Sequence, residues 1–295
     1  MISYIVPSNQ PLRQVLVLCY TRGMIIAVDT GGTKTLVAAF SDKGAIKEEI
    51  KFPTPKNKKE WVRQLRQAIE DVSHEARIDV IVVAVPGIVK NGVAVWCNHL
   101  LWANYNVQAE IEAQFPGIPI LVENDANLGG LGEVRRLKNI PSSALYVTIS
   151  TGIGTGFISD GVIDPGLRLS EGGRSLIEYN GVVQEWEMFG AGSSVYAAYG
   201  KFARDIHSKR IWKQIADRFS RGFLAIIPLA QPSVIIIGGS MGTYFDRYEE
   251  ALLGILREKM PPHIPVPKFA KAKDAEKAVI YGCYFYGSDW TRQGR

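Results

Sequence analysis

Apolar and polar positions along this chain predict strands and helices in alternation. Short apolar runs bounded by glycine, proline or aspartate predict buried strands in the first half of the chain. Apolar residues from Trp61 to Ala76 recur at helical spacing and predict an amphipathic helix. A second, short helix is expected from Val107 to Phe115. The expected strands of this half are 25–28, 36–40, 46–52, 80–85 and 118–122.

The second half of the chain restarts the same scheme. A strand at 144–150 leads into a turn rich in glycine and threonine, and the returning strand is expected to open at Phe157. One more buried strand is expected at 234–237. A restart of this kind indicates an internal duplication and two α/β lobes with mixed sheets. The expected helices of this half are 195–206, 211–229, 244–259 and 274–286.

Length and charge agree with two lobes. A chain of 295 residues is longer than one compact core of typical size. The net charge is +5, and basic residues gather at 56–59 and 268–273 without interleaved aromatic residues. A solvated basic surface is therefore favoured over a nucleic-acid interface.

The cysteines and the N-terminal segment indicate no special chemistry. Cys19, Cys97 and Cys283 are far apart and form no CxxC pair, so neither a disulfide framework nor a cysteine zinc site is indicated, and a reducing cytoplasm is expected. The apolar run 15–19 is too short for a membrane helix and lacks the layout of a signal peptide. Because a strand begins at Met24, we expect residues 1–23 to be an extension or a misassigned start.

Two turns rich in glycine and threonine are the main chemical signal. Each follows a buried strand and closes a hairpin. Glycine lets the backbone approach a phosphate, and successive backbone N–H groups bind anions. An aspartate at the strand end suits water-mediated contact with Mg²⁺. The alternative is two hairpin turns without a ligand, but their pairing favours phosphate binding. The expected contacts are Asp29 (with Mg²⁺ through water), Gly31, Gly32, Thr33, Lys34, Thr151, Gly152 and Gly154.

The spacing of these glycines excludes two common nucleotide-binding motifs. A Walker A loop requires Gly-x-x-x-x-Gly-Lys-Ser/Thr, which is absent from both turns. A Rossmann fingerprint leads from a strand into a helix, whereas the glycines of the second turn are expected to lead into a strand.

Gly238, Gly239 and Ser240 stand between a buried strand and an expected helix. Glycines at such a point let a flat adenine or a ribose pack on the backbone, with a helix N-terminus nearby. A plain strand-to-helix turn is the alternative, and the local pattern does not separate the two.

Asp125 is the candidate for acid–base chemistry. It follows the strand 118–122, and a carboxylate at a strand end is placed to enter a cleft. Phosphoryl transfer uses a positioned base that accepts the proton of the attacking hydroxyl. A helix cap by Asp or Asn before Leu128 is the alternative that the local pattern leaves open.

Taken together, these segments resemble the sugar kinases of the ROK family (repressors, open reading frames, kinases) in the actin/hexokinase/Hsp70 superfamily. The likeness extends over nearly everything from Met24 onward, and the order and spacing of its segments carry it. These are 29–34, 85–87, 123–127, 131–133, 148–156 and 237–239.

The resemblance implies two actin-like (ribonuclease H-like) lobes with five-stranded mixed sheets, and ATP and sugar in the cleft between them. It implies that Asp125 is the catalytic base and that Asn124 holds a sugar hydroxyl. Further sugar contacts are implied for Glu171 and Glu187, and Asn98 and Trp102 resemble residues near the family's sugar pocket. For each glutamate, a solvated surface carboxylate is the alternative.

One departure from the family pattern concerns zinc. Family members usually carry a histidine where this chain has Arg174, followed by a cysteine cluster, and these together bind structural zinc. The matching region, 178–185, holds no cysteine. Zinc needs about four nitrogen or sulfur ligands, so we expect no zinc and a loop held by packing and hydrogen bonds. Arg174 can donate hydrogen bonds to a sugar hydroxyl or favour an anionic substrate.

The sequence thus predicts an ATP- and Mg²⁺-dependent hexose kinase with glucose as the leading substrate. Within the family, the alternatives are kinases of N-acetylhexosamines or of fructose. Two further alternatives are a non-catalytic sugar-binding regulator and a degenerate kinase. The expected lobes are 24–123, joined by a helix at 274–290, and 124–273. We expect no nucleic-acid or membrane partner, and the family implies a homodimer.

Overall fold

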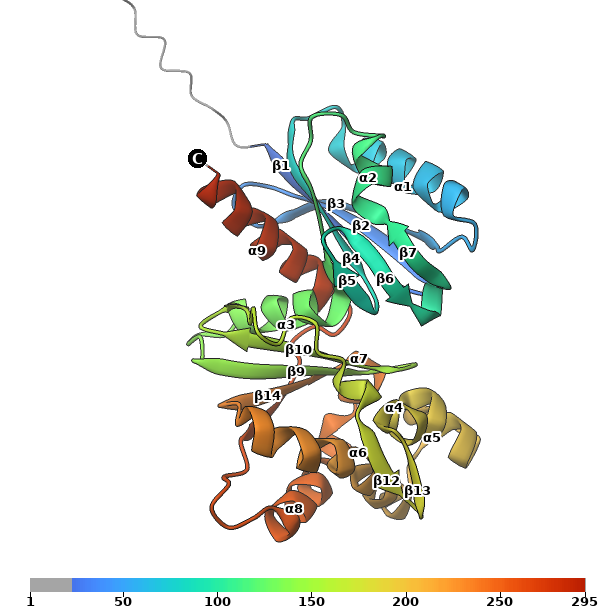
Figure 1. Ribbon diagram of the computed structural model, residues 1–295, viewed down its shortest axis with the longest axis vertical. Coiled ribbons are helices and arrows are strands. Elements are labelled where there is room, and N and C mark those ends of the chain that lie inside the picture. Colours follow the sequence, from blue (N-terminus) through green and yellow to red (C-terminus); the bar gives the residue numbers. More distant parts are fainter. Residues whose placement is uncertain (1–22, 295) are drawn as a thin grey trace, which may run out of the picture.

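The structure is a computed structural model that describes residues 23–294. The extension expected at residues 1–23 lies almost wholly outside this range. The described chain forms two five-stranded β-sheets, each covered by helices, and the two lie one above the other in Figure 1. Within the described part of the chain, no helix is long and apolar enough to cross a membrane.

The first sheet has the strand order β3-β2-β1-β4-β8. β1 pairs antiparallel with β2 and parallel with β4, so a meander joins a parallel half. The strands of the parallel half are nearly continuous apolar runs because both faces of the sheet are covered. Its strands are β1 (Met24–Thr30), β2 (Lys34–Phe40), β3 (Ile46–Pro53), β4 (Ile78–Val85) and β8 (Ile120–Asn124).

The helices α1 (Lys58–Ser73) and α2 (Val107–Glu112) cover one face of this sheet. Trp61, fully buried in α1, meets Trp102 edge to face with ring centroids 4.9 Å apart. Beside them lies a small sheet of β5 (Ile88–Lys90), β6 (Val93–Cys97) and β7 (Trp102–Asn106), with the turn η1 (Asn98–Leu100) between the last two strands.

The second sheet repeats the arrangement of the first, with the order β11-β10-β9-β14-β15. β9 pairs antiparallel with β10 and parallel with β14, which is the pattern expected of a duplicated lobe. Its strands are β9 (Ser143–Ile149), β10 (Ile153–Ser159), β11 (Val162–Ile163), β14 (Val234–Gly238) and β15 (Lys268–Lys271).

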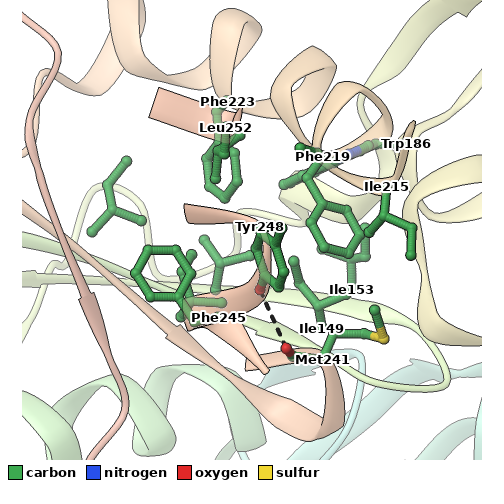
Figure 2. Close-up of a cluster of buried hydrophobic side chains, with 14 of the residues drawn as sticks. Ile149, Ile153, Trp186, Ile215, Phe219, Phe223, Met241, Phe245, Tyr248 and Leu252 are labelled. Carbon is green, nitrogen blue, oxygen red and sulfur yellow. Dashed lines mark hydrogen bonds between the residues drawn. The ribbon is translucent and has the colours of Figure 1, made fainter. Parts of the chain in front are cut away.

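A large aromatic core fills the outer side of the second sheet (Figure 2). Trp186, Phe219 and Phe223 are fully buried there, and the hydroxyl of Tyr248 donates a 3.3 Å hydrogen bond to the carbonyl of Met241. The helices around this core are α4 (Trp186–Gly190), α5 (Gly192–Tyr199), α6 (Lys209–Ala230), α7 (Gly239–Gly242) and α8 (Glu249–Lys259).

A third core joins the two sheets. It lies around α3 (Asp125–Arg135) and α9 (Ala278–Gln293), which pack against each other, and α9 also packs on β1 and β4 (Figure 1). Apolar residues from both sheets enter it, among them Val82 and Tyr146. Because α3 begins directly after β8, this core fixes the start of α3 relative to both sheets.

Several expected elements differ from those observed. The helix expected at 195–206 ends at Gly200, which has a φ of +63°, and a 3₁₀ turn, η3 (Ala203–Asp205), follows. The helix expected from 244 is α8, which begins at Glu249 after the short α7 and the 3₁₀ turn η4 (Phe245–Arg247). The last helix begins at Ala278 and not at 274.

Candidate active site

One cavity of about 440 Å³ lies between the two sheets. Turns and strand ends from both lobes line it, as the carboxyl ends of parallel strands do in open α/β sheets. Predicted site residues that line this cavity are Gly31, Gly32, Thr33, Asn124, Asp125, Thr151, Gly152, Gly154, Glu171, Arg174 and Glu187. The structure therefore brings together both glycine turns and three of the four predicted site carboxylates.

The first glycine turn is the short connection between β1 and β2. The amide of Gly31 donates to the carbonyl of Lys34 at 2.9 Å, and the Thr54 hydroxyl donates to the carbonyl of Gly31 at 2.8 Å. Lys34 itself is exposed and lies outside the lining of the cavity. Lys56 lines the cavity on the side of this turn, and its Nζ lies 3.4 Å from the Gly32 carbonyl. The phosphate contact through Lys34 stays a prediction, and Lys56 is a second basic side chain close to this turn.

The second turn is shorter than expected. The returning strand β10 begins at Ile153 and not at Phe157, so Gly154 and Gly156 lie inside a strand. A Cβ on Gly156 would lie 2.3 Å from the Ala126 carbonyl oxygen, and one on Gly152 would lie 2.3 Å from a carboxylate oxygen of Glu187. Glycine is required here for the close approach of α3 and Glu187 to the strand.

Asp125 is the first residue of α3, at the end of β8. Its Oδ1 accepts a 2.8 Å hydrogen bond from the amide of Ala126. Burial raises the pKa of Asp125, while that hydrogen bond and a charge on His99 oppose the rise. Asp29, at the end of β1, has a pKa raised to about 7 by burial and by the Asp125 charge. Asp29 and Asp125 line a common cavity, so two carboxyl groups with raised pKa values lie in one region, as in many catalytic sites.

Asn124, and not Asp125, caps α3. Its Oδ1 accepts from the amide of Asn127 at 2.9 Å, and its Nδ2 donates to the Gly87 carbonyl at 2.9 Å. The helix cap that the sequence allowed for this segment is therefore Asn124, and the Asp125 side chain lines the cavity. Because an amide nitrogen carries two hydrogens, Asn124 keeps one donor for a ligand.

Glu171 and Glu187 approach the cavity from the second lobe. Burial is the main cause that raises the pKa of Glu171 to about 7; the Asp125 and Glu187 charges add to the rise, and Arg174 opposes it. The Oε2 of Glu187 accepts a 2.8 Å hydrogen bond from the amide of Ile153. Both side chains are therefore partly removed from solvent, which argues against solvated surface carboxylates.

Sequence reasoning missed several cavity residues, Lys56, Trp96 and His99 among them, and misplaced Trp102. Trp96 and His99 line the cavity but lie in the small sheet and its turn, where no motif marks them. Trp102, expected near the sugar pocket, is 2% exposed and packs in the core against Trp61. The side chain of Asn98 lies outside the part of the chain that the structure describes.

Two further cavities continue from the first. One of about 450 Å³ is lined by Asp29, Gly239 and Ser240 and shares Asp125 with the main cavity. The other, of about 540 Å³, lies between Tyr196, Tyr244 and Ser240 and shares Thr151. Gly238 lines neither of them; a Cβ there would lie 2.2 Å from the Tyr146 hydroxyl, so its role is close packing. An extended ligand can run from the glycine turns toward the aromatic rings.

The region where zinc ligands were considered is the hairpin of β12 (Leu176–Tyr179) and β13 (Val182–Glu185). Its Tyr179 ring stacks on Phe189 with centroids 4.5 Å apart, and Arg218 lies over the same ring. Over residues 23–294, no three His, Cys, Asp or Glu side chains are grouped to hold a metal ion. The absence of zinc stays a prediction.

Comparison with known proteins gives three relevant results. A family model described as the ROK family matches residues 25–285. An N-acetylmannosamine kinase from Salmonella typhimurium is 24% identical over 277 residues, 85% of this chain and 94% of that protein. A ROK family glucokinase from Streptomyces griseus, solved with glucose and AMPPNP, superposes with a TM-score of 0.76 at 20% identity over 92% of this chain and 100% of that chain.

Another solved relative is not named as an enzyme. A ROK family transcriptional regulator, a homologue of the E. coli MLC protein, superposes with a TM-score of 0.75 at 17% identity. The match covers 90% of this chain and 77% of that chain. At these identities the superpositions show a common two-lobed fold, and the predicted fold class is confirmed.

Proposed function

This chain belongs to the ROK family, and we propose that it is an ATP-dependent kinase of a small sugar with Asp125 as general base. The observation that carries the proposal is the single cavity in which Asp125 lies with both glycine turns. Phosphoryl transfer depends mainly on positioning and on charge stabilisation, and this cavity supplies a base and two sets of backbone donors.

In the proposed reaction, Asp125 accepts the proton of a sugar hydroxyl while the hydroxyl oxygen forms a bond to the terminal phosphorus of ATP. The bond from that phosphorus to the bridging oxygen breaks, and ADP leaves. The glycine turns at Gly32 and Gly152 would offer backbone N–H groups to the phosphates. The cavity beside Tyr196 and Tyr244 would take the base of the nucleotide.

Asp29 fits a water-mediated contact with Mg²⁺. Its carboxylate accepts no hydrogen bond and forms no ion pair within the described residues, although it is half-buried at a cavity wall. Mg²⁺ commonly uses one or two carboxylates and keeps several waters. When bound with ATP, the ion would neutralise phosphate charge.

The comparisons support two sugar classes equally. The Salmonella typhimurium relative is named an N-acetylmannosamine kinase, and the Streptomyces griseus structure is a glucokinase with bound glucose. We therefore propose a hexose or an N-acetylhexosamine as substrate, with glucose and N-acetylmannosamine as the first candidates. Glu171 and Glu187 would accept hydrogen bonds from sugar hydroxyls, and Asn124 would donate one.

A panel of sugars with ATP, Mg²⁺ and coupled ADP detection tests the proposal. Glucose, N-acetylmannosamine, N-acetylglucosamine and fructose should be compared at equal concentration. We expect ADP formation with one of these classes well above the rate without sugar. Absence of turnover with every sugar, combined with measurable sugar binding, would instead favour the non-catalytic regulator that the fold also allows.

The remaining parts of the assignment are also proposals. We propose lobe boundaries at 24–123 and 124–273, with α9 completing the first lobe, since α9 packs on β1 and β4. A cytoplasmic location follows from the cysteine pattern, a homodimer from the family resemblance, and the absence of a nucleic-acid partner from the charge pattern. All three stay predictions.

A further inference from the structure

Arg174 lies at a junction of two carboxylates and a tryptophan. Its Nη1 lies 2.5 Å from Oε2 of Glu185, and its Nη2 lies 3.3 Å from Oε1 of Glu187. Its Cζ lies 4.6 Å from the centre of the Trp96 ring. The two nitrogens at the end of the guanidinium fork are therefore engaged by acidic partners, while its face covers an aromatic ring.

These contacts connect the two walls of the cavity. Trp96 belongs to β6 beside the first sheet, whereas Arg174, Glu185 and Glu187 belong to the second lobe. The Arg174 side chain is 26% exposed and that of Glu187 is 16% exposed. Ion pairs with this degree of burial are screened less by solvent than pairs on an open surface.

Arg174 and the Ile153 amide together hold the Glu187 carboxylate. One carboxylate oxygen of Glu187 accepts from the amide of Ile153, and the other faces Arg174. Both oxygens are thus held, and the carboxylate has one preferred orientation at the cavity wall. The Arg174 charge also lowers the pKa of Glu171 against the effect of burial, which favours the carboxylate form of that side chain.

We propose that Arg174 is a positioning residue for sugar binding, held by Glu185 and Trp96, and that it orients Glu187 without itself binding an anion. The proposal rests on the proposed sugar site. Two carboxylates already compensate the Arg174 charge, so little of it remains for an acidic substrate. The Arg174 guanidinium, held in this way, affects sugar affinity through its effects on Glu187 and Glu171.

Glu185 allows a test outside the cavity, because its side chain does not belong to the lining. The variants are Arg174→Met, Arg174→Lys and Glu185→Gln. Glu178→Gln is the matched control, since Glu178 is exposed on the same hairpin and its carboxylate accepts a hydrogen bond from the turn amide of Gly181. Dissociation constants for glucose and N-acetylmannosamine are measured by calorimetry without ATP, and that for ATP separately.

We expect Arg174→Met to weaken binding of the preferred sugar by about tenfold to a hundredfold, as for the loss of hydrogen bonds between charged groups. Glu185→Gln should weaken it by about threefold to tenfold, and Arg174→Lys should recover part of the loss. ATP binding should change less than about twofold in every variant. Glu178→Gln should bind both ligands as the unaltered protein does.

Unchanged sugar affinity in Glu185→Gln and Arg174→Met would overturn the proposal, and so would equal losses for sugar and ATP. If Arg174→Met does not fold, Glu185→Gln decides alone. A preference of the unaltered protein for glucuronate over glucose that is lost in Arg174→Met would show that Arg174 binds anions directly, and it would also overturn the proposal. Sugar binding without turnover would count against the kinase function and not against the role of Arg174.

Discussion

Sugar binding should weaken at acidic pH through protonation of Glu171. This side chain lies in the cavity wall among Asp125, Arg174 and Glu187. Its pKa is raised from 4.5 to about 7, first by burial and then by the Asp125 charge, and Arg174 lowers it. A protonated carboxyl offers fewer acceptor sites to a sugar hydroxyl than a carboxylate does. The raised pKa therefore moves this loss into an accessible pH range.

The size of the effect follows from that pKa. With a pKa of about 7, roughly one-tenth of Glu171 is protonated at about pH 8 and roughly nine-tenths at about pH 6. If only the carboxylate form binds sugar well, the dissociation constant rises by about tenfold between these two pH values. Binding at about pH 7 should also release roughly half a proton per sugar, because the sugar selects the ionised form.

Calorimetric titration of the preferred sugar without ATP measures both quantities. Experiments at several pH values give the affinity, and buffers of different ionisation enthalpy give the proton count. Glu171→Gln is the test variant, since it retains the size and one acceptor oxygen but does not titrate. Its affinity should vary much less with pH, and it should release no proton from this position.

An unchanged pH dependence in Glu171→Gln would refute this reasoning. The titrating group would then be another one that faces the cavity, such as Asp125. Proton uptake in place of release would also contradict it, because the sign requires that sugar prefers the carboxylate.

Two further predictions concern the frame around the site. Gly222→Ala should lower the free energy of unfolding in urea by about 1–3 kcal/mol, because its Cβ would lie 2.1 Å from buried Trp186 ring atoms. The matched Gly254→Ala, in an exposed turn of α8 with open space around it, should raise stability by about 0.5–1 kcal/mol, and equal effects would contradict the packing argument. EDTA should leave the thermal unfolding midpoint unchanged, because the β12–β13 hairpin is held by aromatic packing; a clear decrease would reveal a structural metal.

Much of the fold was predictable because the central strands of both large sheets are buried on both faces. Runs such as 25–28 and 234–237 are uninterrupted and apolar, and turn residues bound them closely. The repeated meander with its glycine turn indicated two related lobes, and the two sheets share one strand order. Long amphipathic helices such as α1 and α6 were predicted for the same reason, since one face is buried.

The predicted boundaries of β10 and α5 were wrong because glycine occurs both in turns and at close packing contacts. Gly154 and Gly156 were predicted to lie in a turn, but they lie in β10 because α3 passes close to that strand. Gly200, in contrast, does reverse the chain direction. Its positive φ ends a helix that the apolar pattern alone would continue. A local pattern does not distinguish close packing from chain reversal.

The site was predictable only where residues follow strand ends. Asp125 and Asp29 were found in this way, and the structure brings both to the connected cavities. Lys56, Trp96 and His99 reach the cavity from loops and from the small sheet, and only tertiary packing places them there. The catalytic and binding roles of all these residues stay predictions.

The most direct test of the central claim compares the initial rate of sugar-dependent ADP formation in the unaltered protein with that in Asp125→Asn. The substitution keeps the side-chain size and removes the base. Sugar and ATP affinities serve as controls that the cavity is intact. We predict a loss of about 10²- to 10⁴-fold in turnover number with both dissociation constants nearly unchanged. Full turnover in Asp125→Asn would contradict the assignment of Asp125 as the base of a sugar kinase.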